Sequence, residues 1–361
     1  MGLAGLPNVT DDIVAAVKAP PPASKQHTRR STLLHRNRIQ QENNMSEKVT
    51  RRSALKGLGA LGAAGLTLSG PSARAANKPV VGLDSRYGIN DLDLSTPEAR
   101  SSIITKVMGS IGTEDTHAFM RFHIYGYLGD RSLVPLFSMN NYLVQKWKLI
   151  EPGTSELRHY EVGYYCEFDT DNPITHWTNP VTGKTVELEQ FVLGPIGRMY
   201  TPQGIIAPGI APNPLRVNVV GNRVFVPAQS LETFPNMFTP EEFPELSSGP
   251  TIFWDSMYTF SANIEDVLNP ELTSAPAEIH MQNMTSWQPF FGFGNLPGRS
   301  MVRSWGCNIS GFDALEPQVR AGFEKYTPDI FETDTWNDVR FDSMDYYNKV
   351  KAERAAKAGE S

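Results

Sequence analysis

The sequence predicts a mainly β protein, built as an antiparallel β-barrel or a strongly curved sheet, with short helices near both ends of its folded part. About nine or ten short strand-like segments follow one another along the chain, separated by turn-forming residues. No long helical pattern lies between these strands, so antiparallel neighbours are favoured over a parallel sheet with helical crossovers. Closure into a barrel would remove the exposed edge strands of such a sheet.

The front of the chain contains the three parts of a signal peptide in order. Arg51 and Arg52 come first, an apolar run of mainly Gly, Ala, Leu and Thr follows over 57–70, and the sequence ARA over 73–75 offers a cleavage site. The paired arginines resemble a twin-arginine export signal. The apolar run is too short and glycine-rich to span a membrane, which needs about 20 apolar residues. We therefore expect export through the twin-arginine translocase, to the periplasm or the exterior.

These features divide the chain into four expected parts. Residues 1–44 show no clear pattern and are interpreted as an incorrectly assigned start or a disordered tail, with Met45 as the true start. Residues 45–75 are the expected signal peptide. Residues 76–342 are expected to form a single β-rich domain, and 343–361 a charged C-terminal helix.

Loss of the first 75 residues would make the remaining chain strongly acidic. That part of the chain holds 11 of the 33 Lys and Arg but only 4 of the 39 Asp and Glu, so 22 basic and 35 acidic residues would remain. A surface this acidic repels phosphate backbones and anionic lipids. We therefore expect a soluble, extracytoplasmic protein with no nucleic-acid partner and no membrane span in the mature chain.

The sequence contains no metal or cofactor motif of high specificity. It has no Cys/His cluster with zinc spacing, no glycine-rich loop after a strand and no nucleophile-elbow pentapeptide. His117 and His123 would lie about 20 Å apart on an extended strand, too far to share one ion. We predict neither a metal nor a cofactor. Cys166 and Cys307 could form one disulfide in an oxidising compartment, although two buried thiols are the simpler interpretation.

A short helix and a long alternating strand are expected at the start of the folded domain. The helix begins near Pro97 and continues towards Met108, with the apolar residues Ile103, Ile104 and Val107 on one face. The strand covers 117–128 and alternates strongly. Its apolar face contains Ala118, Met120, Phe122, Ile124 and Leu128.

The opposite face of this strand mixes aromatic rings with titratable groups, namely His117, Phe119, Arg121, His123, Tyr125 and Tyr127. Such a mixture suits the wall of a polar and aromatic ligand cavity, and it also occurs on half-exposed strands. Arg121 could clamp a carboxylate or enolate with its planar fork. His123 could move a proton near neutral pH, and Tyr125 could donate to an oxyanion.

A meander of short strands is expected over 160–188. Two strand-like runs over 133–150, around Asn140 and Asn141, and a further run over 157–168 lead into it. Its parts are a break at 169–173, a strand over 174–178, a turn at 179–183 and an exit strand over 184–188. We interpret it as the corner that sets strand register, because Asn179 precedes a proline and Trp177 is a large anchor.

The second half of the domain contains further strands and connections. The proline- and glycine-rich segment 191–214 is expected to be a long ordered loop or lid over the fold. Residues 215–228 predict a hairpin with its turn around Gly221 and Asn222. The other expected elements are a connection over 234–250, strands over 251–262, 278–286 and 299–307, and helices over 313–326 and 343–358.

Two blocks of the sequence resemble the domain-of-unknown-function 1838 family (DUF1838). The first, HWTNPVTGKTV over 176–186 after Tyr164 and Tyr165, is similar to that family's Trp-x-Asn-Pro-x-Thr-Gly turn and the strand after it. The second is WQPFFGFG over 287–294, in which phenylalanines replace a usual Trp and Met. With an early strand at 136–137, the resemblance covers about residues 94–336. It implies a lipocalin- or calycin-like barrel, by analogy of architecture.

A barrel of this kind would store a small hydrophobic or aromatic molecule, or transform one with few side chains at its mouth. We expect Arg121, His123, Tyr125 and His176 as catalytic candidates. The expected ligand contacts are His117, Phe119, Trp177, Trp287, Phe290 and Phe291. Two hypotheses stay open: a cofactor-independent isomerase, cyclase or lyase, and a non-catalytic carrier of such a ligand.

Overall fold

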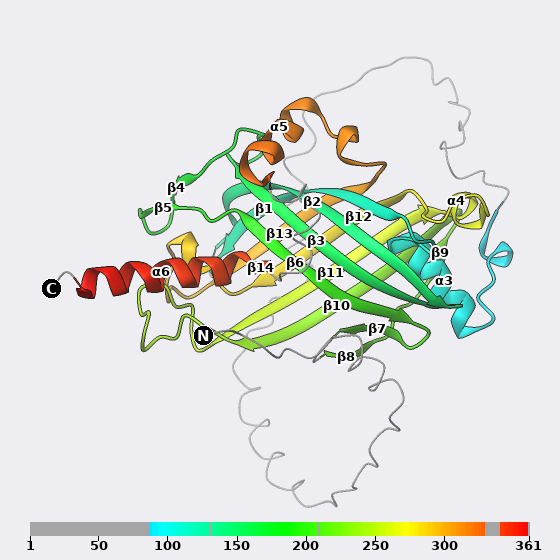
Figure 1. Cartoon of the computed structure of the whole chain (residues 1–361), viewed down its shortest axis with the longest axis horizontal. Helices are drawn as coiled ribbons and strands as arrows, with labels where there is room; N and C mark the ends of the chain where they lie inside the picture. Colours follow the sequence, from blue (N-terminus) through cyan, green and yellow to red (C-terminus); the bar gives the residue numbers. More distant parts are fainter. Residues whose placement is uncertain (1–86, 130, 208–209, 329–339, 360–361) are drawn as a thin grey trace, which may run out of the picture. The chain divides into compact units, whose positions relative to one another are not determined.

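The computed structural model describes residues 87–361, except 130, 208–209, 329–339 and 360–361 (Figure 1). All described residues belong to one compact unit of the chain. The expected signal peptide and the segment before it lie outside the described residues. The predicted fold class is confirmed, because one large antiparallel sheet curls into a half-barrel and a helix follows it at the C-terminus.

The large sheet has 12 strands in the described part of the chain. Its order is β8-β7-β6-β3-β2-β1-β13-β12-β11-β10-β9, and β14 also pairs with β6. The curl brings β8, at one edge, into contact with β10 near the other edge. Its strands are β1 (Asp115–Tyr127), β2 (Val134–Glu151), β3 (Thr154–Cys166), β6 (Phe191–Thr201), β7 (Gly204–Ala207), β8 (Ile210–Asn213), β9 (Asn218–Val220), β10 (Arg223–Pro235), β11 (Thr251–Asn263), β12 (Ala277–Thr285), β13 (Arg299–Ile309) and β14 (Arg340–Phe341).

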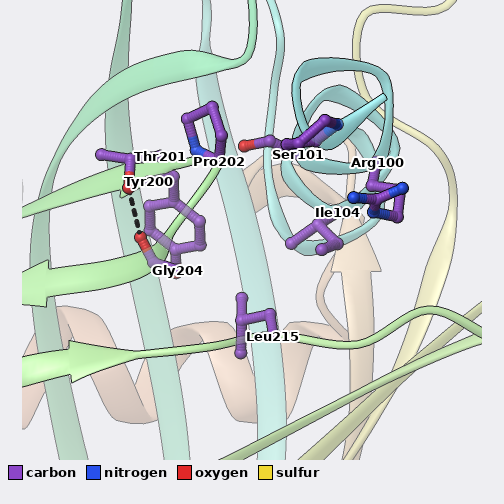
Figure 2. Close-up of a pocket in the computed structure, with 9 residues that line it drawn as sticks. Arg100, Ser101, Ile104, Tyr200, Thr201, Pro202, Gly204 and Leu215 are labelled. Atoms are coloured by element: carbon purple, nitrogen blue, oxygen red, sulfur yellow. Dashed lines mark hydrogen bonds between the residues drawn. The ribbon is translucent and has the colours of Figure 1, made fainter. Parts of the chain in front are cut away.

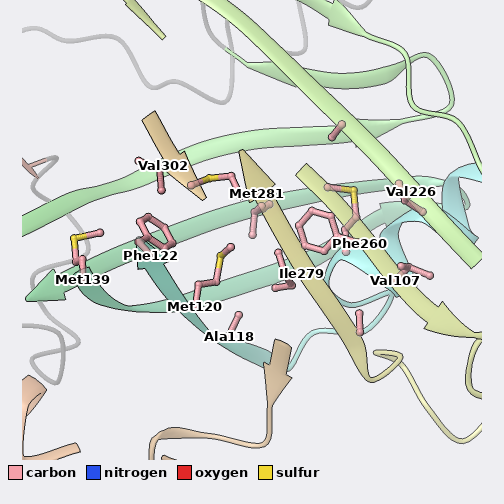
Figure 3. Packing of buried hydrophobic residues seen from close by; sticks show 14 of the residues in the cluster. Val107, Ala118, Met120, Phe122, Met139, Val226, Phe260, Ile279, Met281 and Val302 are labelled. Atoms are coloured by element: carbon pink, nitrogen blue, oxygen red, sulfur yellow. The ribbon is translucent and has the colours of Figure 1, made fainter. Parts of the chain in front are cut away.

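Alternation along the strands gives the sheet a concave inner face and a convex outer face. On β1 the inner positions are Ala118, Met120, Phe122 and Ile124, all buried, so the apolar face predicted for this strand is confirmed. These side chains join one hydrophobic cluster with Met139, Val226, Phe260, Ile279, Met281 and Val302 from the other strands (Figure 3). Burial of each large apolar side chain contributes about 1.5–3 kcal/mol, which makes this cluster the main source of stability.

Helix α3 (Pro97–Met108) closes one end of the concave face. The Thr96 hydroxyl caps it by accepting the N–H of Ala99 at 3.1 Å, and proline occupies the first turn, as the sequence predicts. The helix contacts β3 and β6 on one wall and β10 and β11 on the other, and its Val107 is fully buried. The two walls of the half-barrel are therefore joined through this helix.

A buried lysine ties α3 to the short helix α4 (Ile264–Leu268). The Lys106 ammonium donates to the carbonyl oxygens of Val267 and Asn269 at 2.7 and 2.6 Å. These carbonyls lie at the C-terminal end of α4, where backbone acceptors lack partners within the helix. The two hydrogen bonds thereby give partners to the Lys106 ammonium and to the last carbonyl groups of α4.

Aromatic side chains close the opposite end of the concave face. The Phe137 ring, near the start of β2, lies 4.9–5.0 Å from the rings of Tyr165, Trp177 and Phe291. Trp287 stacks on Phe293 at 3.8 Å. We call this group the aromatic plug; it consists of Phe137, Tyr165, Trp177, Trp287, Phe290, Phe291 and Phe293, together with the short helix η2 (Pro289–Phe291).

A small hairpin is fastened to this plug. Its strands β4 (His176–Thr178) and β5 (Thr185–Glu187) form a separate two-stranded sheet. In the turn, the Asn179 side-chain oxygen accepts the N–H groups of Val181 and Thr182 at 2.8 and 3.0 Å, and its NH₂ donates to the Phe291 carbonyl at 2.9 Å. The predicted hairpin is confirmed. Its predicted role as the corner of the meander is wrong, because it pairs outside the large sheet.

The two C-terminal helices pack on different parts of the sheet. Helix α5 (Pro317–Tyr326) covers the outer face of β3, with Gly322 so close to the Tyr164 ring that a Cβ there would lie 2.3 Å from it. Helix α6 (Asp342–Gly359) follows β14, and its Tyr346 ring lies 5.5 Å from that of Phe290 in the plug. Both helices were predicted, although α5 begins four residues later than expected, after the short helix η3 (Phe312–Ala314).

Two strand predictions are wrong. Residues 134–151 form one strand, not two, because the NH₂ groups of the buried Asn140 and Asn141 donate hydrogen bonds inside the sheet and no turn forms there. Residues 191–214 hold three strands in place of a loop or lid. Pro195 lies where the pairing of β3 with β6 shifts register, so its missing N–H removes no ladder hydrogen bond.

The cysteines are free in the structure. Cys166 is buried on β3 and Cys307 is exposed on β13, with β2 and β1 between them, so they do not form the disulfide that the sequence leaves open. The expectation of a buried thiol holds for Cys166 and is wrong for Cys307. Among the described residues, no helix has the length and apolar character needed to cross a membrane.

We predict that Asn179→Ala destabilises the fold by about 1–3 kcal/mol, because the buried Phe291 carbonyl and two turn N–H groups lose their partners. Urea unfolding followed by tryptophan fluorescence measures this change. Thr178→Ala is the matched control, since this neighbouring side chain is exposed and bonds only the Thr185 hydroxyl, at 2.9 Å. Equal losses in the two variants would contradict the role given to Asn179.

Candidate functional site

Arg121, predicted to clamp a ligand, lies on the outer face of β1 and is already engaged by protein groups. It is buried and donates to the Asn140 side-chain oxygen at 2.6 Å. It also donates to the Thr170 carbonyl oxygen and to the Asp171 carboxylate. Arg121 therefore fastens the loop after β3 to the sheet, and Asp171 occupies the place where a ligand carboxylate was expected.

His123 and Tyr125 lie beside the same loop. The His123 Nε2 atom is 3.4 Å from a carboxylate oxygen of Asp169, and both rings pack against Phe168, at 5.3 and 5.4 Å between centroids. Asp169 has a φ of +59°, a left-handed conformation that costs a non-glycine residue about 1 kcal/mol. The structure thus brings three of the four predicted catalytic residues together, on the outer face and away from the concave one. Their catalytic role stays a prediction.

The remaining predicted residues are dispersed. His176 is exposed on β4, with its Nδ1 atom 3.2 Å from the Thr175 hydroxyl. His117 and Phe119 are on the outer face of β1, where the Tyr142 hydroxyl lies 2.9 Å from His117 Nδ1 and burial lowers the pKa of that histidine. The other predicted ligand contacts belong to the aromatic plug, namely Trp177, Trp287, Phe290 and Phe291; the last three are buried.

The concave face carries a polar group that the sequence analysis missed. By register, Glu161 on β3 lies opposite Leu193 of β6, and Arg198 of β6 lies opposite the inner-facing Leu157. Tyr258 comes from β11 on the other wall, and the charges of Glu161 and Arg198 both act on its pKa. The curl therefore brings side chains from opposite walls within electrostatic reach. We call Asn141, His159, Glu161, Arg198 and Tyr258 the inner-face cluster.

Glu161 is the titratable group of this cluster with functional potential. Burial raises its pKa to about 7, against the opposing effects of a hydrogen bond with Asn141 and the positive charge of Arg198. Burial is therefore the dominant effect, even though a guanidinium is near. A carboxyl group with a pKa near 7 can both take up and release a proton at neutral pH.

The other titratable groups of the cluster are held in one protonation state. Burial and the Arg198 charge lower the pKa of His159 to about 3, so its imidazole is neutral. Burial, followed by the charge of Glu161, raises the pKa of Tyr258 well above its usual value, so its hydroxyl stays a hydrogen-bond donor.

Asp342, at the start of α6, is a further acid near this cluster. Burial raises its pKa to about 7, and Glu161 is one of the acids that contribute.

Arg198 differs from Arg121 in having no hydrogen-bond or ion-pair partner in the part of the chain that the structure describes. It is half-buried on the inner face, and among the described residues its guanidinium forms no hydrogen bond or ion pair. Five N–H donors in a planar fork are thus available. Such a group on an enclosed face favours a carboxylate or another anion, because desolvation without a partner is costly.

Unpaired oxygens occur on the same face. The buried Asn141 side-chain oxygen, beside Glu161, has no hydrogen-bond partner in the described part of the chain. The same holds for oxygens of Asn283, Thr285 and Ser300, which lie on the inner sides of β12 and β13 and are 2–4% exposed. Buried polar atoms normally have partners, so these oxygens indicate places for water or for polar groups of a ligand.

A small hollow lies farther along β6, between its turn to β7 and helix α3 (Figure 2). Its lining includes Arg100, Ser101, Ile104, Tyr200, Thr201 and Leu215. The volume is about 30 Å³, which suits a water molecule. Ligand pockets are usually about 300–1,000 Å³. This hollow is therefore too small to be the binding site.

Comparison with known protein families matches residues 115–351 to the family described as "Protein of unknown function (DUF1838)". The chain belongs to this family. No curated protein matches it. The matched residues run from β1 into α6 and include the inner-face cluster, the aromatic plug and the loop around Arg121.

The two blocks that resemble DUF1838 contact each other in the fold. Besides the Asn179–Phe291 hydrogen bond, the Thr182 hydroxyl donates to the Gly292 carbonyl at 3.1 Å. Trp177 and Phe293 also approach each other, with ring centroids 6.5 Å apart. The DUF1838 resemblance thus rests on residues that close one end of the half-barrel, and the inner-face cluster lies outside both blocks.

Weak sequence signals for the missed residues exist. Glu161 is a charged residue inside a strand whose other positions on that face are Leu157, His159, Gly163 and Tyr165, and a charge on an inward-facing position is uncommon. Arg198 lies in the segment predicted as a loop, so its face could not be assigned. The described residues contain no group of three or more His, Cys, Asp or Glu side chains arranged to hold a metal ion.

We predict that the contribution of Glu161 to the free energy of unfolding falls as the pH rises. Because its pKa is about 7 in the fold and about 4.5 when unfolded, the folded state binds the proton more tightly. Its contribution is most favourable below pH 4.5 and is lost as the pH rises to about 7, with a total of about 1–3 kcal/mol for a partly accessible carboxyl.

Urea unfolding of the wild type and Glu161→Gln at several pH values tests this, and the same pair in an Asp342→Asn background removes the titration of Asp342, whose pKa responds to Glu161. The difference in unfolding free energy between wild type and variant should fall between pH 4.5 and 7. A difference that does not change with pH would contradict the assigned environment of Glu161.

Proposed function

We propose that the concave face binds a small molecule with a hydrophobic or aromatic body and an anionic head. The observation that carries this proposal is the Arg198 guanidinium, which is half-buried on the inner face without a partner among the described residues. A carboxylate that accepts two of its N–H groups would satisfy the charge and the directions of these donors.

Apolar side chains around Arg198 suit the body of such a ligand. Leu193 and Ile196 on β6 share the inner face by register with Glu161 and His159 and are only partly buried. Trp254, on the inner side of β11, is also partly buried and lies opposite Thr285 in the sheet. Partly exposed apolar groups with a few polar ones are typical of ligand-binding surfaces.

The proposal assigns the binding of a ligand carboxylate to Arg198 in place of Arg121. Arg121 was expected to hold a ligand carboxylate, but Asp171 fills that position. Arg198 offers the same chemistry on the face that curls around a ligand. A non-catalytic carrier and an enzyme both fit this binding mode, and the carrier needs only Arg198 and the apolar surface.

We predict that Arg198→Met weakens binding of 8-anilinonaphthalene-1-sulfonate, an aromatic anion, by about tenfold or more, because a charged hydrogen-bonding group is lost. Fluorescence titration of the full chain measures the dissociation constant. Arg303→Met, on the exposed outer side of β13, is the matched control and should leave the constant unchanged. Equal binding by wild type and Arg198→Met would overturn the proposed anchor.

Export through the twin-arginine route is a second part of the proposal, supported by the order of Arg51-Arg52, the apolar run and the cleavage site in the sequence. In a bacterial host, the wild-type chain should appear outside the cytoplasm, shortened by cleavage after residue 75. The double variant Arg51→Lys, Arg52→Lys should stay unprocessed in the cytoplasm. Unchanged cleavage and location of that variant would exclude this route.

A further inference from the structure

We infer that the open edge of strand β10 is an association surface, and that its partner is a second copy of this chain, bound edge to edge in an antiparallel dimer. This dimer does not depend on the ligand proposed for the concave face. Three features support it: the pairing register of β10, the positions of two prolines and the exposure of Leu231.

Most of β10 pairs with another strand on one side only. All of Arg223–Pro235 pairs with β11 without a register shift, whereas β9 pairs only with residues 223–225. In the part of the chain that the structure describes, no strand pairs with the other edge of residues 230–235, and β8 comes close to β10 without forming a ladder with it. Figure 1 shows β10 as the last long strand on this side of the sheet. Such an edge presents backbone N–H and C=O groups to a further strand.

The turn between β9 and β10 shows which backbone groups of β10 point to this edge. Val220 and Arg223 flank a two-residue turn whose first residue, Gly221, has a φ of +59°, as in a type II′ hairpin. Residues that flank such a turn exchange their N–H and C=O groups. Arg223 therefore points these groups to the β9 side, and every second residue after it does the same because the register is unbroken. Leu231 and Thr233 thus point their N–H and C=O groups to the open edge.

Two prolines agree with this assignment and limit the length of the edge. Pro227 and Pro235 lie an even number of residues from Leu231, so the N–H that each lacks would have pointed to the open edge and not to β11. Each is four residues from Leu231. In an antiparallel pair of two β10 strands centred on Leu231, Pro227 of one copy lies opposite Pro235 of the other. The ladder then ends where neither strand has a donor, so the segment matches a copy of itself.

The side chains of this segment also fit a second copy. Leu231 is 67% exposed on the outer side and meets the other Leu231 at the twofold axis. On the inner side, Ser230 lies opposite Glu232 of the other copy, and within each chain the Ser230 hydroxyl already donates to the Glu232 carboxylate. Glu232 is the only charged residue over 227–235, so no like charges are directly opposed. Edge strands that avoid pairing often carry lysines or a bulge, and β10 has neither there.

This pairing is closed and keeps both concave faces on the same side. A twofold axis perpendicular to the sheet relates the two strands, so both edges are used and a third copy cannot add at them. The two Leu231 residues exchange a pair of backbone hydrogen bonds. The inner sides of the two sheets therefore join next to Ser230 and Glu232.

Sedimentation velocity of the full chain over a range of concentrations tests the dimer. The wild type should sediment as a dimer in equilibrium with the monomer. Leu231→Lys should raise the dimer dissociation constant by about 30-fold or more, because two leucines leave the interface and two lysines meet at the axis. Thr233→Pro should raise it by about fivefold or more, since one N–H that points to the edge is lost from each copy.

Trp305→Lys is the matched control. This side chain is 55% exposed on the outer side of β13, three strands from the edge, so its replacement should leave the dissociation constant unchanged. Far-UV circular dichroism should show that all three variants keep the strand content of the wild type.

Several results would overturn the dimer. A wild type that stays monomeric at all concentrations would do so and would leave the edge for an extended peptide of another protein. A dimer that is equally stable in Leu231→Lys would exclude pairing through β10. Loss of the dimer in Trp305→Lys but not in Leu231→Lys would assign the contact to the outer face of the sheet. Species larger than a dimer would contradict the closed twofold arrangement.

Discussion

The half-barrel depends on closure of both ends of its concave face, and the Asn179 carboxamide secures one of them. Of its three hydrogen bonds, two order the turn of the small hairpin and one joins that turn to the Phe291 carbonyl, so two segments more than 100 residues apart hold the aromatic plug in place. At the other end, α3 contacts both walls. With the ends filled by apolar side chains, the face between them is enclosed enough to change the pKa of groups that point into it.

This enclosure explains why the polar side chains around Arg121 differ from those of the inner-face cluster. Around Arg121, on the outer face, the polar side chains have nearby partners, as Arg121 has Asp171 and His123 has Asp169. Such pairing stabilises a loop and leaves little capacity for a ligand. On the inner face Arg198 has no partner among the described residues. Burial raises the pKa of Glu161 to about 7. Unsatisfied polar groups are costly to a fold, so their retention favours a role in binding.

Much of the fold could be predicted from local patterns, and the site could not. The alternation of β1, the proline at the start of α3 and the hairpin at Gly221 each depend on neighbours in sequence, and all agree with the structure. The strands β6 to β8 were missed because their prolines and glycines indicate loops unless the register shift beside Pro195 is known. Arg121, His123 and Tyr125 were correctly placed on one face, but alternation alone does not say which face is concave. Glu161 and Arg198 come from two strands that pair with each other, and only the curl of the sheet brings Tyr258 of the other wall within electrostatic reach of them.

The central claim is that Arg198 anchors an anionic ligand on the concave face. Native mass spectrometry of the full chain, purified without denaturation from its own host, tests it most directly. We expect the wild type to carry a small acid of defined mass that is released on denaturation, and Arg198→Met, purified in the same way, to lack it. A bound molecule that is retained equally by both proteins, or a wild type that carries none and binds no aromatic acid added to it, would contradict the account.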